Sequence, residues 1–238
     1  MVAKLRSILR PTHWSLLVKA IIFGVLWLFL PYPLFLIGAL YLYLIPVFRP
    51  VKMALPFLGL IVLSGLVERG FFIALAIGAT YYIIDGIKDL IFIRRRMSYE
   101  ILVFLIMFIG SVGLYSQTGW LTLLGVIWSF VLSVFAILLL RELSLYGDPP
   151  IRSVAKKDVR VVVFGLVGFF VWQLSIVLFI LPLGSMYQAA ILFLTSAVLI
   201  EIAMTYLSGE LTRNKLLINF TVLFIFMVFV IASNNWGL

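Results

Sequence analysis

Long apolar runs, separated by short polar clusters, constrain this sequence more than any other feature. The runs are roughly 17 to 22 residues long, the length of helix that crosses a hydrocarbon core about 30 Å thick. They are apolar all round and lack the alternation of a barrel strand, so we expect helices. Charged residues make up only 11% of the chain and hydrophobic residues 65%. The sequence therefore predicts an all-α, polytopic bundle in the cell membrane.

We predict one transmembrane domain over residues 1–238, with about nine spans. Pro31 and Pro33 separate the first two runs, because neither fits the interior of a continuous helix. We interpret these runs as two spans, and an eight-span chain with a re-entrant first pair is the alternative. The predicted spans are residues 14–30, 32–48, 51–67, 71–92, 101–115, 120–140, 161–181, 186–207 and 216–232.

The basic residues predict the orientation. With a cytoplasmic N-terminus and nine spans, fifteen of the 18 lysines and arginines lie on the cytoplasmic side and Arg69 alone lies outside. The C-terminus is then outside. Because this asymmetry accounts for the net charge of +9, we expect the lipid bilayer as partner and no nucleic acid. Residues expected to contact anionic lipid headgroups are Arg94, Arg95, Arg96, Arg152, Lys156, Lys157 and Arg160.

Residue counts exclude several kinds of chemistry. The chain has no cysteine, which rules out disulfides, thiol catalysis and cysteine-ligated zinc. It has one histidine, so a haem held by two histidines is ruled out as well. We therefore expect no metal and no cofactor. Enzymatic activity is left open but is not the leading expectation.

Ionisable residues inside the spans are the best candidates for function, because charges at membrane depth are costly and face the protein interior or water. Asp85, Lys88 and Asp89 lie in the fourth span, and Glu201 lies in the eighth. Asp85 and Glu201 each lie about 13 Å from the predicted cytoplasmic end. We therefore hypothesise that both face one polar cavity and bind a substrate or a proton. Gln173 in the seventh span is a lesser candidate, more typical of a contact between helices.

The same residues also allow structural interpretations. Lys88 would neutralise one aspartate and extend towards the headgroups, and Glu201 would be protonated or paired with Lys88 or Lys19. Ala74 and Gly78 share a helix face with Asp85, and small residues there permit close approach of a neighbouring helix.

Three classes of function follow. The leading prediction is a transporter of a small molecule, an ion or a lipid that uses the carboxylate pair. The second is an intramembrane enzyme acting on a lipid or prenyl diphosphate, in which the D-x-x-x-D spacing of Asp85 and Asp89 would hold Mg²⁺. The third is a non-catalytic subunit or scaffold, with a membrane-protein partner or a second copy of the chain.

Overall fold

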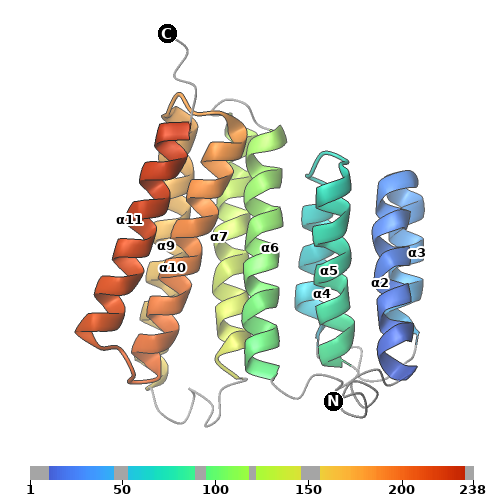
Figure 1. Cartoon of the computed structure of the whole chain (residues 1–238), viewed down its shortest axis with the longest axis horizontal. Coiled ribbons are helices and arrows are strands. Elements are labelled where there is room, and N and C mark those ends of the chain that lie inside the picture. The colour runs from blue at the N-terminus through green and yellow to red at the C-terminus, as the bar shows by residue number, and fades with distance from the viewer. Residues whose placement is uncertain (1–10, 46–52, 89–94, 118–121, 146–155, 234–238) are drawn as a thin grey trace, which may run out of the picture. The chain divides into compact units, whose positions relative to one another are not determined.

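The structure, a computed structural model, describes residues 11–45, 53–88, 95–117, 122–145 and 156–233. Within these ranges the chain forms nine α-helices and no strand (Figure 1). Six of the helices are long and apolar enough to cross a membrane: α5 (Phe71–Lys88), α6 (Arg95–Gln117), α7 (Leu123–Leu143), α9 (Lys157–Ile180), α10 (Ser185–Leu207) and α11 (Arg213–Ser233). The other three helices are α2 (Pro11–Phe29), whose apolar part is Trp14–Phe29, and the shorter α3 (Tyr32–Leu44) and α4 (Ala54–Ser64).

Each predicted span overlaps one of these helices, which confirms the helical prediction. The predicted span 51–67 is too long, because α4 ends at Ser64 and the next residues form a turn. The 13 residues of α3 extend about 20 Å and the 11 residues of α4 about 16 Å, both less than a hydrocarbon core of about 30 Å. Nine complete crossings and the orientation of the chain therefore stay predictions.

Contacts divide the chain into two compact units, residues 1–109 and residues 110–238. The division falls within α6, which is one continuous helix. The single transmembrane domain predicted from the sequence therefore stays a prediction.

In unit 1, α2 and α3 form an antiparallel hairpin around Pro31. Lys19 in the middle of α2 donates a hydrogen bond of 2.9 Å to the carbonyl of Ile45 at the end of α3. The first two apolar runs are therefore two helices side by side, not one kinked helix. The next helix, α4, returns along the hairpin, because the Trp27 indole of α2 donates to the carbonyl of Ser64, the last residue of α4.

Aromatic rings fill the core of unit 1. The ring of Phe23 in α2 stacks on Tyr81 in α5, with centroids 4.2 Å apart. It also meets the rings of Phe35 in α3 and Phe57 in α4 edge-on. All four side chains are buried, and such pairs stabilise a core beyond the area that they bury. This cluster joins α2, α3, α4 and α5.

In unit 2, α7 packs on α9, α9 on α10, and α10 on α11. Buried polar groups are satisfied at the helix ends: the Gln188 amide of α10 donates to the carbonyls of Leu178 and Leu181, where α9 ends. The Tyr115 hydroxyl of α6 donates to the Ser175 carbonyl of α9. None of the residues Arg213–Ser233 is buried, so α11 is the outermost helix of this unit.

Candidate functional site

Three charged side chains meet in the interior of unit 1, and we call Lys19, Asp85 and Lys88 the charge cluster. The Asp85 carboxylate lies between the two lysines, with Oδ1 3.1 Å from Lys88 Nζ and Oδ2 3.3 Å from Lys19 Nζ. The side chains of Asp85 and Lys88 are 0% exposed, whereas that of Lys19 is 19% exposed. Asp85 and Lys88 are close because positions three apart lie on one face of a helix.

The charge cluster also caps α3. Besides the Lys19 bond to Ile45, the Lys88 ammonium donates to the carbonyl of Tyr43 and lies 4.7 Å from the centroid of the Tyr43 ring. The last carbonyls of a helix have no partner within the helix and form the negative end of its dipole. The two lysines therefore donate to the last carbonyls of α3 and also pair with Asp85. These contacts join α2, α3 and α5.

These contacts decide part of what the sequence left open. Lys88 does pair with an aspartate, as the structural interpretation expected. Its extension towards the headgroups is wrong, because the side chain is fully buried and its ammonium points at a carbonyl. Lys19 is likewise engaged by Asp85 and not by Glu201 in the described contacts. Asp85 is thus paired with two lysines, one on its own helix and one on α2.

The other candidates of the substrate or proton site are Glu201, Gln173 and Asp89. Glu201 is exposed on α10 in unit 2, and its backbone carbonyl accepts the Thr205 hydroxyl. Gln173 is exposed on α9. Because Asp85 and Glu201 belong to different units, their shared cavity stays a prediction. Asp89 lies outside the described residues.

The predicted headgroup contacts are described in part. Lys156 and Lys157 are exposed where α9 begins, and Arg160 is half-buried one turn later. Arg96 forms an ion pair of 3.0 Å with Glu100 in the first turns of α6. Arg94, Arg152 and the side chain of Arg95 lie outside the description. Contact of these residues with lipid stays a prediction.

A close contact between α2 and α5 adjoins the charge cluster. A Cβ added to Gly24 would lie 2.9 Å from the carbonyl oxygen of Ala74, and one added to Gly78 would lie 3.0 Å from that of Ala20. Only glycine therefore lets the two backbones come this close. The predicted close approach at Ala74 and Gly78 is confirmed, and the partner is α2.

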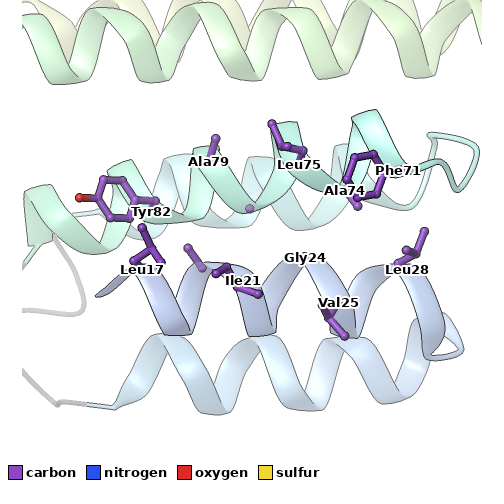
Figure 2. A pocket seen from close by; sticks show the side chains of 12 residues that line it. Leu17, Ile21, Gly24, Val25, Leu28, Phe71, Ala74, Leu75, Ala79 and Tyr82 are labelled. Atoms are coloured by element: carbon purple, nitrogen blue, oxygen red, sulfur yellow. The ribbon is translucent and has the colours of Figure 1, made fainter. Parts of the chain in front are cut away.

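An apolar groove of about 400 Å³ runs along this contact, and we call it the α2–α5 groove. Figure 2 shows its side chains, with Leu17 and Tyr82 at one end and Leu28 and Phe71 at the other. Every lining residue is apolar except Tyr82. Lys19, Asp85 and Lys88 are not part of this lining, and Lys19, two positions from Leu17, lies on the opposite side of α2.

The described residues contain no group of three His, Asp or Glu side chains that could hold a metal ion. The predicted Mg²⁺ pair is not tested by this, because Asp89 is not among them. However, each carboxylate oxygen of Asp85 faces an ammonium group, and a cation would have to displace both lysines.

The described residues form helices and no strand, and six of these helices are long and apolar enough to cross a membrane, as expected for a multi-pass integral membrane protein. Comparison with known proteins gives no matching family model, no similar curated protein and no similar solved structure. The arguments about function therefore rest on the charge cluster and the groove.

Sequence reasoning did not find two of these features. It placed Lys19 within a span but did not identify it as the partner of Asp85. It also singled out Gln173, although the buried glutamine that joins two helices is Gln188. Lys19 lies in an apolar run with no acidic residue in the same helix. This pattern could have indicated an acidic partner on another helix.

Proposed function

We propose that this is a lipid-handling membrane protein of the transporter class, in which the α2–α5 groove holds the hydrocarbon chain of a membrane amphiphile. The observation that carries the proposal is the groove itself, whose lining is apolar except for the Tyr82 hydroxyl. Such a lining offers dispersion contacts along its whole length and few hydrogen bonds. It suits a hydrocarbon chain and not a polar solute.

The length of the groove supports this assignment. The lining runs from Leu17 to Leu28 on α2, which at 1.5 Å per residue is about 16 Å. Half of a hydrocarbon core of about 30 Å is about 15 Å. The groove therefore matches the depth of one leaflet, the distance that a single lipid chain spans.

Among the cargoes predicted from the sequence, a lipid fits these contacts better than an ion or a polar small molecule. An ion pathway would need Asp85 to face water, but this carboxylate is buried and bound by two ammonium groups. The groove, in contrast, presents apolar side chains and the Tyr82 hydroxyl. That lining suits the hydrocarbon chain of a lipid.

Photocrosslinking tests the proposal. The purified full-length protein, reconstituted with phospholipids carrying a photoreactive group in the acyl chain, should be labelled mainly on peptides of α2 and α5. The variant Ala79→Phe places a large ring in the groove away from the close glycine contact and should reduce this labelling severalfold. Ala232→Phe, the same change at an exposed position of α11, is the control. Unchanged labelling of Ala79→Phe would contradict the proposal.

A further inference from the structure

The α2–α5 groove lies towards one end of its two helices. On α2 its lining starts six residues, or about 9 Å, after the first residue, Pro11, and reaches Leu28 near the last. On α5 the lining starts at the first residue, Phe71, and stops about 9 Å short of the last, Lys88. Leu28 and Phe71 lie at the same end of the groove (Figure 2). The groove is therefore displaced towards that end of the helix pair.

The two ends of the groove also differ in how far α5 is enclosed. At one end, the side chains of Phe71 and Phe72 are 69% and 84% exposed. Beyond Tyr82, at the other end, every residue from Ile84 to Lys88 is buried. A hydrocarbon chain can therefore leave the groove past Phe71, whereas α5 is covered past Tyr82. On the side of α5, the groove is open at its first end and closed at its second.

A charged turn places the open end at the membrane surface. Glu68 and Arg69 are exposed in the turn that joins α4 to α5. The Arg69 guanidinium donates to the carbonyl of Leu30, two residues beyond the groove, so the turn lies at the open end. Exposed charges and backbone that is not helical stay out of lipid hydrocarbon. Tyr82 lies about 16 Å along α5 from Phe71, so the closed end lies near the middle of the membrane.

We infer that the lipid in the α2–α5 groove comes from the leaflet on the side of Glu68 and Arg69, with its polar end at Phe71 and its terminal methyl group at Tyr82. This inference rests on the proposed function and narrows the ligand to lipids of one leaflet. The reverse placement would put a polar headgroup near the middle of the membrane, against a lining that is apolar except for Tyr82. With the predicted orientation of the chain, the lipid comes from the outer leaflet.

The test uses two phosphatidylcholines that differ only in the position of a photoreactive diazirine. The ester probe carries it next to the ester of one acyl chain, and the chain-end probe carries it at the end of that chain. Each probe is reconstituted with the full-length protein in nanodiscs, and the labelled positions are mapped. Labelling that is specific to the groove is the part that Ala79→Phe removes and that Ala232→Phe, at an exposed position of α11, leaves unchanged.

The two probes should label opposite ends of the groove. We expect the specific labelling by the ester probe to be severalfold stronger at Leu28 and Phe71 than at Leu17 and Tyr82. The chain-end probe should show the reverse ratio. The comparison of the two probes in one protein removes differences in the intrinsic reactivity of the labelled residues.

The outcomes separate the inference from the proposed function. If the ester probe labels specifically at Leu17 and Tyr82, the lipid lies the other way round, and the inference is wrong although the groove still holds a chain. Equal specific labelling of both ends by the ester probe would also overturn the inference, because the groove would then not distinguish the leaflets. If Ala79→Phe removes labelling by neither probe, the proposed function fails and the inference with it. If Ala79→Phe does not fold, Ala79→Leu, a smaller addition at the same position, takes its place.

Discussion

Lys19 Nζ and Asp85 Oδ2 lie 3.3 Å apart, although the two residues are 66 positions apart in the sequence. With Lys88, they form a charge cluster that closes one end of the α2–α5 contact and caps α3. A single charge is costly in an apolar interior. Here the three charges are paired, and their contacts join α2, α3 and α5. The pairing also assigns Asp85 a structural partner on each side.

Neutralising Asp85 should destabilise the protein strongly. In Asp85→Asn both lysines lose their counter-ion, and Lys88 is fully buried. Removing one partner of a buried ion pair costs about 3–5 kcal/mol, because the other charge remains without compensation. Thermal unfolding in detergent should show a clearly lowered midpoint.

Glu201→Gln is the matched control, because it removes a carboxylate charge from an exposed position on α10. It should leave the midpoint nearly unchanged. If the two variants unfold at the same temperature, the charge cluster does not stabilise unit 1 as described.

The close contact of α2 and α5 should be sensitive to a single methyl group. The Cβ of Gly24→Ala would lie 2.9 Å from the backbone carbonyl oxygen of Ala74, which cannot turn aside as a side chain can. Overpacking of this kind costs about 1–3 kcal/mol. Gly165→Ala on α9 meets nothing within 4 Å and should be neutral or slightly stabilising, since alanine favours a helix. Equal effects on the midpoint of unfolding would show that the glycine contact is not tight.

Replacing two glutamines on neighbouring helices should lower the free energy of unfolding by very different amounts. Gln188→Leu leaves the carbonyls of Leu178 and Leu181 without their buried donor, at a cost of about 1–3 kcal/mol. Gln173→Leu replaces an exposed amide with an apolar group and should cost little. The same unfolding measurement compares them. A greater loss for Gln173→Leu would indicate that this glutamine has a partner outside the described contacts.

The orientation predicted by the basic residues can be checked with single cysteines, because the chain has none of its own. Gly184 directly precedes α10, Thr212 lies in the turn between α10 and α11, and both are exposed. In intact cells a membrane-impermeant maleimide should label Gly184→Cys and leave Thr212→Cys unlabelled until the membrane is opened. The reverse pattern would invert the predicted topology.

The helices could be predicted well from the sequence, because apolar runs, prolines and charged breaks are local signals. The stripe of Ala74 and Gly78 likewise predicted a close helix contact, since residues four apart lie on one face. The ends of α3 and α4 were missed, because apolar composition continues past them, although Pro46 and Gly65 follow closely and are typical of helix ends.

The charge cluster was predictable only in part. The pair of Asp85 and Lys88 follows from their spacing within one helix. The contact of Lys19 with Asp85 does not follow from spacing, because the two residues lie on different helices. Which helices meet depends on the packing of the whole unit. The groove has no sequence signature at all, since its leucines and alanines resemble those of any apolar helix.

The placement of the three charges has a consequence for the order of synthesis. Asp85 and Lys88 emerge from the ribosome together and can neutralise each other as soon as α5 forms its last turn. Lys19 emerges much earlier, when its partner Asp85 has not yet been synthesised. We therefore expect the hairpin of α2 and α3 to remain incompletely inserted until α5 is made, so that a nascent chain halted before Asp85 is more readily extracted from the membrane than one halted after Lys88.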